Sequence, residues 1–203
     1  MENLEEKLKD ANETAFSRLG SSKALYALTN GEMEAAPITN AVAADSALTY
    51  DICRQWAGEL TDPLGSAVEK IATTAGDRHQ AINDNITEPA DSTIKTTLTQ
   101  MTRPPARAGG LFGWTLVREE RLGQVTGFFV GNADPRAASQ FRSYRAEVST
   151  EADQLAEAIV TQYNDTDSQQ EAVNRAANDI IEAAYDEYVT TLQSLGIEPK
   201  NVC

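Results

Sequence analysis

The sequence predicts an all-α protein, an up-down four-helix bundle of the ferritin-like kind with additional short helices. Apolar residues recur at helical spacing in nearly every segment, and no segment alternates apolar and polar residues with period two. Helix start and stop signals separate the segments. A length of 203 residues, 41% of them hydrophobic, suits one helical domain spanning residues 1–203.

The N-terminal part, residues 1–31, is interpreted as a helical extension of the bundle. Leucine and alanine recur at helical spacing from Leu4 to Leu19, and Gly20 ends this first helix. A short second helix follows and ends at Asn30-Gly31.

The bundle itself is assigned to residues 37–164. One long helix is predicted from Pro37 to Leu60 and the next from Asp62-Pro63 to Ile86, and the very short turn between them makes them antiparallel neighbours. A short helix near residues 94–101 and a loop, RPPARAGG, lead to a third long helix over residues 111–130.

Two further helices complete the predicted bundle, and a last one follows it. Asp134-Pro135 begins a helix, and a capping box at Thr150 and Asp153 begins another. The final long helix covers residues 168–195 and ends at Gly196. The third long helix contains Gly113, Gly123 and Gly127, which predict a face that either packs closely on another helix or borders a pocket.

The charge balance indicates which solvent environments and which classes of partner suit the protein. The chain carries 31 acidic and 17 basic residues, a net charge of -14, and the acids recur along its whole length. Such a chain suits a high-salt cytoplasm, where salt screens the repulsion between carboxylates, although an ordinary acidic mesophilic protein has the same balance. Without clustered Lys and Arg we expect no nucleic-acid partner, and without a long apolar run no membrane span. Cys53 and Cys203 form neither a disulfide framework nor a zinc pattern.

His79 is the only histidine, so imidazole chemistry depends on it. It lies on the apolar stripe of the second long helix, and Asp45 lies on the stripe of the helix before it, which makes the two expected partners. Each is interpreted either as a metal ligand or as a structural core residue. Glu119 and Glu120 are read either as a solvated pair or as inward-facing carboxylates. The only concentration of basic residues is formed by Arg103, Arg107, Arg118 and Arg121. It is interpreted either as a site for an acidic partner or an anion, or as a set of local ion pairs, which is the reading preferred in so acidic a chain.

Two stretches carry a resemblance to a known family. NAVAADSALTYDICRQWAGEL and GWTLVREERLGQVTGFFVGNADPRAASQFRSYRAEV resemble rubrerythrin-like, ferritin-like helical proteins of salt-loving archaea. The resemblance implies a ferritin-like fold, and members of the family bind two irons and handle peroxide or oxygen. Asp45 then falls at the first-helix Glu, Gly76 and His79 at a Glu-x-x-His pair, and Glu119 or Glu120 at the third-helix Glu. Since Gly76 is no ligand, the implied metal site shrinks to Asp45, His79 and Glu120.

Three hypotheses about function follow from these observations. The first is a cytoplasmic binding or assembly module with a degenerate di-metal site and no cofactor, whose partner is another protein or a second copy of itself. The second is a metal-dependent oxidoreductase of the rubrerythrin type, with iron or manganese at an atypical site. The third is a structural protein that assembles through its amphipathic first or last helix.

Overall fold

The computed structural model describes residues 4–82, 92–163 and 167–199, and these residues are almost entirely helical. The all-α prediction is therefore confirmed. The helices follow one another as α1 (Leu4–Ala11), α2 (Glu13–Leu19), α3 (Lys23–Leu28), α4 (Ala35–Trp56), α5 (Leu64–Ile82), α6 (Thr93–Thr99), α7 (Pro104–Gly131), α8 (Pro135–Tyr163) and α9 (Asp167–Ser194), with a 3-10 turn at Ala57–Glu59.

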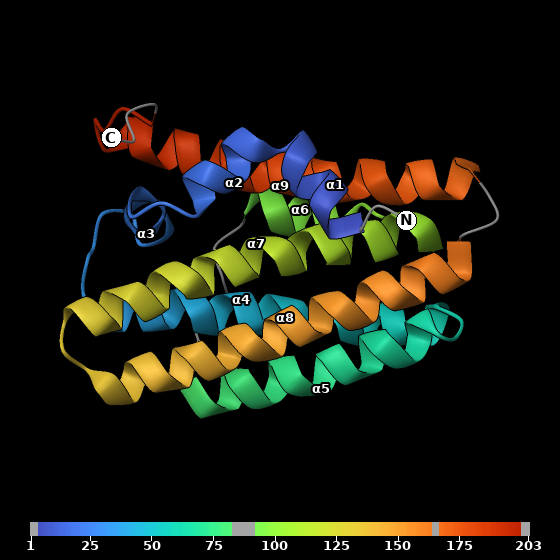
Figure 1. Cartoon of the computed structure of the whole chain (residues 1–203), viewed down its shortest axis with the longest axis horizontal. Coiled ribbons are helices and arrows are strands. Elements are labelled where there is room, and N and C mark those ends of the chain that lie inside the picture. The colour runs from blue at the N-terminus through green and yellow to red at the C-terminus, as the bar shows by residue number, and fades with distance from the viewer. Residues whose placement is uncertain (1–3, 83–91, 164–166, 200–203) are drawn as a thin grey trace.

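Four of the long helices close a ring. Helix α4 packs on α5, α5 on α8, α8 on α7 and α7 on α4. Helix α9 lies along α7 on the side away from α5, and α1, α2 and α3 lie against α9 (Figure 1). Because α7 contacts both the ring and α9, it is the central helix of the molecule.

The start of α7 corrects the sequence prediction. The segment RPPARAGG was expected to be a loop, but α7 begins at Pro104 and contains all of it except Arg103, its N-cap. The two prolines occupy the first turn, where the missing N–H groups would have had no helical partner. The two glycines are buried in the helix, since an added Cβ would meet Val173 of α9 at Gly109 and Met101 at Gly110. Tertiary packing therefore overrides the loop signal.

Helix α8 is also longer than predicted. It runs unbroken from Pro135 to Tyr163, so the predicted capping box at Thr150 and Asp153 is wrong. The Thr150 hydroxyl donates to the carbonyl of Ala146 inside the helix instead. The predicted cap at Asp134 is present, because its carboxylate accepts from the backbone N–H of Ala137.

The predicted first helix is divided in two. Helix α1 ends at Ala11 and α2 begins at Glu13. Between them the amide of Asn12 donates to the Leu8 carbonyl and to the Asn178 side chain on α9. This contact ties the N-terminal helices to the rest of the molecule.

The structure answers in part whether the glycine face of α7 packs on another helix or borders a pocket. A Cβ added at Gly113 would lie 2.6 Å from the Ala177 carbonyl oxygen, so this part of the face packs closely on α9. A Cβ added at Gly123 would approach the Arg145 guanidinium at 3.4 Å, and one at Gly127 would meet nothing within 4 Å. Close helix packing therefore explains Gly113 and not Gly127.

Candidate functional site

The interior of the four-helix ring holds a buried network of charges. Glu151 of α8 lies between two arginines: its Oε1 accepts from Arg78 Nη2 of α5 at 2.8 Å, and its Oε2 accepts from Arg118 Nη2 of α7 at 3.0 Å. The side chains of all three are at most 6% exposed. We call the group the central network; its members are Thr74, Arg78, Thr115, Arg118, Glu147 and Glu151.

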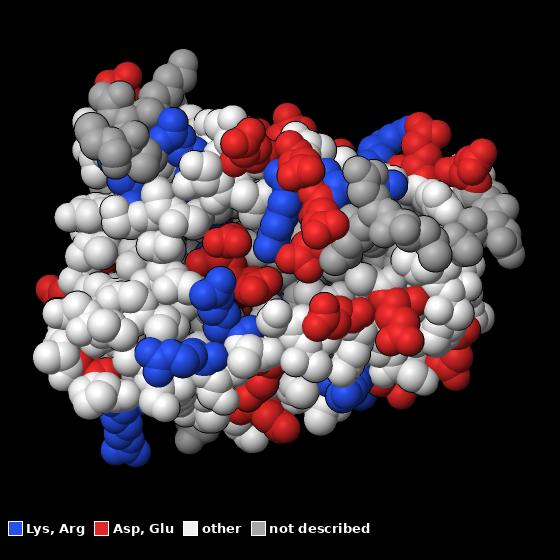
Figure 2. Space-filling view, viewed as in Figure 1, with Lys and Arg blue, Asp and Glu red and all other residues white. Residues whose placement is uncertain are grey.

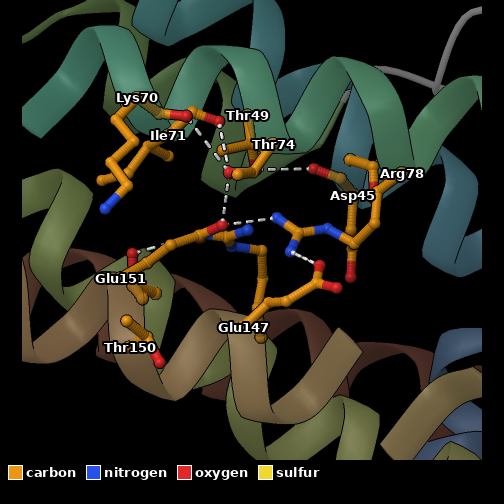
Figure 3. Close-up of polar contacts among 12 residues, drawn as sticks. Asp45, Thr49, Lys70, Ile71, Thr74, Arg78, Glu147, Thr150 and Glu151 are labelled. Atoms are coloured by element: carbon orange, nitrogen blue, oxygen red, sulfur yellow. Dashed lines mark hydrogen bonds and ion pairs between the residues drawn. The ribbon is translucent and has the colours of Figure 1, made fainter. Parts of the chain in front are cut away.

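Hydrogen bonds from neighbouring helices complete the network. The Thr74 hydroxyl of α5 donates to Glu151 Oε1 at 2.8 Å, and Arg78 also donates to Glu147 Oε2 at 3.1 Å. In Figure 3, Arg78 and Thr74 reach from α5 toward Glu147 and Glu151 of α8. Residues from α5, α7 and α8 are thereby joined through one carboxylate.

Burial and charge act in opposite directions on Glu151. Burial opposes ionisation of this carboxyl, but the Arg118 and Arg78 guanidinium groups outweigh that effect, and together with the Arg78 and Thr74 hydrogen bonds they hold its pKa below the usual value. Burial lowers the pKa of Arg118, and the charge of Glu151 partly offsets this. Glu151 is therefore a carboxylate at neutral pH that two arginines already occupy.

Cys53 lies near this network and is a neutral thiol. It is fully buried and free. Burial raises its pKa to about 12, with Arg118 acting in the opposite direction. A protonated, buried thiol is a poor nucleophile, and this agrees with the sequence interpretation of Cys53 as a small buried hydrophobic residue.

A second ion pair joins α4 to α7. Arg121 Nη1 donates to both carboxylate oxygens of Asp45, at 2.8 and 3.0 Å. The Arg121 guanidinium also lies 5.1 Å from the ring centre of Trp114, whose Nε1 donates to the Thr49 hydroxyl at 2.9 Å. The buried indole therefore packs against the Arg121 side of the ion pair, and its Nε1 is hydrogen-bonded.

The Asp45–Arg121 ion pair forms one wall of a surface pocket, which we call the groove. Its volume is about 380 Å³, and α2, α3, α4, α6, α7 and α9 contribute to its lining. Five alanines give it small apolar walls, namely Ala24, Ala27, Ala41, Ala44 and Ala184. Its polar and aromatic lining includes Asp45, Trp114, Arg121, Glu187 and Tyr188.

Glu187 of α9 faces Arg121 across the groove but does not form a hydrogen bond with it. Its Oε2 lies 3.9 Å from Arg121 Nη2, beyond hydrogen-bond distance. Its Oε1 accepts from the backbone N–H of Ile94 at 3.0 Å, near the start of α6. The Asp45 and Glu187 side chains are 16% and 25% exposed, so solvent reaches both carboxylates.

The three residues of the predicted metal site have separate surroundings. Asp45 pairs with Arg121. His79 is half-buried, and its Nε2 is buried with no hydrogen-bond partner among the described residues. Glu120 lies on the side of α7 that faces Gly20 and Lys9, with its Oε1 4.0 Å from Lys9 Nζ. Within residues 4–82, 92–163 and 167–199, no three or more His, Cys, Asp or Glu side chains group as metal ligands would.

The residues at the centre of the ring were not predicted from the sequence. Arg78 and His79 are neighbours on the same stripe of α5, and Arg78 is the more deeply buried of the two. Glu151 lies three residues after Val148 on the apolar face of α8, but the predicted helix break hid that register. Arg118 and Arg121 do form ion pairs, but their partners, Glu151 and Asp45, are 33 and 76 residues away along the chain and lie on other helices.

Comparison of the chain with protein-family models, with curated proteins and with solved structures finds no match. Across the part of the chain that the structure describes, none of the helices combines the length and the apolar character needed to cross a membrane. The residues of the groove and the central network therefore carry the functional argument.

Proposed function

We propose that this protein is a small-molecule-binding module, a ferritin-like bundle that binds an organic ammonium compound in the groove. The observation that carries the proposal is the groove itself, whose charged lining consists of Asp45, Glu187 and Arg121. These residues sum to one negative charge. A cavity of about 380 Å³ that combines apolar walls with several polar and charged groups has the size of a small-molecule site.

The lining favours a cation with a short apolar body. Arg121 is already engaged by Asp45, whereas Glu187 Oε2 stands 3.9 Å from Arg121 Nη2. An ammonium group beside Glu187 can donate to its Oε2, which is not hydrogen-bonded to Arg121, and the alanine walls leave room for an alkyl chain. Trp114 and Tyr188 also line the groove, and the Trp114 ring already lies against the Arg121 guanidinium.

The central network supports a binding function rather than metal-dependent redox chemistry. A di-metal centre needs carboxylates that are free to bind cations, whereas both oxygens of Glu151 accept from arginines and both oxygens of Asp45 accept from Arg121. In this proposal the guanidinium groups supply the positive charge that the metal ions supply in ferritin-like enzymes.

The test compares three probes that share one alkyl chain. We expect hexylammonium to bind with a measurable heat and to change the fluorescence of Trp114, whereas 1-hexanol and hexanoate bind at least tenfold more weakly. Glu187→Gln should abolish this preference for the cation while keeping an oxygen for the Ile94 N–H. Glu182→Gln, an exposed position on the same helix outside the groove lining, is the matched control. Equal binding of the three probes would overturn the proposal.

A metal-dependent oxidoreductase remains the second candidate, because the buried Nε2 of His79 has no partner among the described residues. An imidazole nitrogen of this kind is a common metal ligand. Elemental analysis of protein purified without chelators decides between the candidates. Stoichiometric iron or manganese in the wild type that is lost in His79→Ala would favour the oxidoreductase, and its absence from the wild type would favour the binding module.

A further inference from the structure

The groove contains an acceptor and a donor that face each other without bonding. Glu187 Oε2 of α9 and Arg121 Nη2 of α7 lie 3.9 Å apart, and both residues line the groove. Each residue is held at its other end, because Glu187 Oε1 accepts from the Ile94 N–H and Arg121 Nη1 donates to Asp45. Among the described residues, neither Glu187 Oε2 nor Arg121 Nη2 has a hydrogen-bond partner.

Both side chains are largely buried, so the pair of free atoms is a feature of the folded protein. The Arg121 side chain is 12% exposed and that of Glu187 is 25% exposed. The guanidinium also lies 5.1 Å from the ring centre of Trp114. Helices α7 and α9, which carry the two atoms, pack along each other. A ligand in the groove therefore meets one free acceptor and one free donor.

An ammonium group alone would use only one of these two atoms. It donates to Glu187 Oε2, but ammonium and guanidinium groups have donors and no acceptor. Beside Glu187 it would displace the solvent that accepts from Arg121 Nη2 and leave that donor unsatisfied, which is unfavourable. The site therefore favours a ligand that carries an acceptor next to its ammonium group.

The charges around the gap favour a neutral acceptor. Asp45 already pairs with Arg121 through both of its oxygens, and the charged lining sums to one negative charge. A carboxylate on the ligand would be repelled by Asp45 and Glu187. A hydroxyl oxygen accepts without a charge of its own, and its hydrogen can be donated to a carboxylate.

We propose that the compound bound in the groove is a 1,2-amino alcohol, whose ammonium donates to Glu187 Oε2 and whose hydroxyl oxygen accepts from Arg121 Nη2. Staggered torsions hold the nitrogen and oxygen of such a compound about 3–4 Å apart. Hydrogen bonds that run side by side from the two protein atoms, 3.9 Å apart, end at a similar separation. This inference rests on the function proposed for the groove and specifies its ligand.

The test compares two isomers that differ only in where one hydroxyl is attached to hexylammonium. In 1-amino-2-hexanol the hydroxyl is next to the ammonium-bearing carbon, and in 6-amino-1-hexanol it is at the far end of the chain. Calorimetric titration of the full chain should show that one enantiomer of 1-amino-2-hexanol binds about fivefold more tightly than hexylammonium, the gain of one hydrogen bond from a charged donor. The 6-amino isomer should bind no more tightly than hexylammonium.

Two results of this comparison would overturn the inference. Selective binding of hexylammonium with no gain from the neighbouring hydroxyl would show that solvent satisfies Arg121, and the proposed function would stand without this ligand class. Tighter binding of 2-aminohexanoate than of 2-amino-1-hexanol, which has the same carbon skeleton, would show that the acceptor is a carboxylate. Failure of hexylammonium to bind more tightly than 1-hexanol would overturn both the inference and the proposed function.

A matched pair of variants identifies the donor. Arg121→Met removes the donor and one positive charge from the groove, so hexylammonium should bind at least as tightly while the preference for 1-amino-2-hexanol is lost. Arg145→Met makes the same change at a side chain of α8 that is 46% exposed and lies outside the groove lining, and it should keep the preference. A preference that persists in Arg121→Met would contradict the assignment. The comparison of isomers in the wild type decides the matter if Arg121→Met does not fold.

Discussion

Glu151 is the residue on which the interior of the ring depends. Taking one carboxylate and two guanidinium groups out of water is unfavourable, and their mutual attraction offsets this only while every partner is present. Both oxygens of Glu151 accept from arginines, and its side chain is 6% exposed. Removing its charge therefore leaves two buried cations facing each other.

We expect Glu151→Gln to lower the free energy of unfolding by about 3–5 kcal/mol, the range found when one partner of a buried pair is removed. The control is Glu147→Gln, which also faces Arg78 but is 43% exposed, and which should cost less than about 1 kcal/mol. Urea unfolding at pH 7 measures both variants. Equal losses would show that burial of Glu151 does not determine its contribution.

The same residue makes an acid-sensitive contribution to stability. Because the pKa of Glu151 is lower in the folded protein than its unfolded value of about 4.3, its contribution is complete above that pH and is lost as the pH falls further. The difference in unfolding free energy between wild type and Glu151→Gln should therefore decrease below about pH 4. Other groups, such as Glu119 with its raised pKa, cancel in this difference. A difference that stays constant from pH 7 to pH 3 would contradict the assignment.

Sequence reasoning found part of this site because helical periodicity identifies a face but not a single residue. It placed Asp45 on an inward stripe and expected the arginines to pair, and both Arg118 and Arg121 do so. His79 was expected to be the inward residue rather than its neighbour Arg78. Helical spacing alone allows either position to belong to the apolar face of α5. The pairing of Arg78 with Glu151 is a tertiary contact between α5 and α8, and the sequence contains no local signal for it.

At the scale of elements, the approach of α7 to α9 depends on residues without side chains. A Cβ at Gly113 would lie 2.6 Å from the backbone oxygen of Ala177, and one at Gly109 would lie even closer to Val173. A backbone atom cannot rotate aside as a flexible side chain can. The two helices can therefore come this close only where glycine is present.

Replacing these glycines should have opposite effects at the two ends of α7. Gly113→Ala should destabilise the protein by about 1–3 kcal/mol, because the added methyl group overpacks the contact with α9. Gly127→Ala should instead stabilise it by about 0.5–1 kcal/mol, since alanine favours the helix and nothing lies within 4 Å of the new Cβ. Thermal unfolding of the two variants checks the signs. A stabilising Gly113→Ala would mean that α9 does not pack here.

The elements themselves were largely predictable, and two of the errors, in α7 and α8, share one cause. Helix α4, the Asp62 carboxylate that accepts from the Ser66 N–H at the start of α5, and the end of α9 near Gly196 follow from local signals that the structure keeps. The first turns of α7 were not predicted because the prolines and glycines there are typical of a loop. The continuity of α8 was not predicted because its Thr-Glu-Ala-Asp sequence resembles the start of a new helix. Packing of Gly109 on α9 and the ion pairs of Glu151 stabilise continuous helices there.

At the scale of the whole molecule, the surface charge is separate from the paired charges inside the ring. The net charge is -14, and Figure 2 shows acidic side chains in several groups over one face with Lys and Arg side chains between them. Exposed charges of one sign repel one another across the surface, and added salt weakens that repulsion. The buried pairs of the central network are screened much less.

The high-salt environment that the charge balance of the sequence leads us to expect gives a prediction that separates these two sets of charges. The Debye length falls from about 10 Å at 0.1 M salt to about 3 Å at 1 M, so the free energy of unfolding should rise over this range of potassium gluconate. Gluconate supplies the ionic strength as a large organic anion that does not occupy a small internal site. The cost of Glu151→Gln should stay nearly constant over the same range, because its partners are buried. A wild-type stability that does not change with salt would contradict the adaptation, whereas a Glu151→Gln cost that disappears in salt would show that solvent reaches the central network.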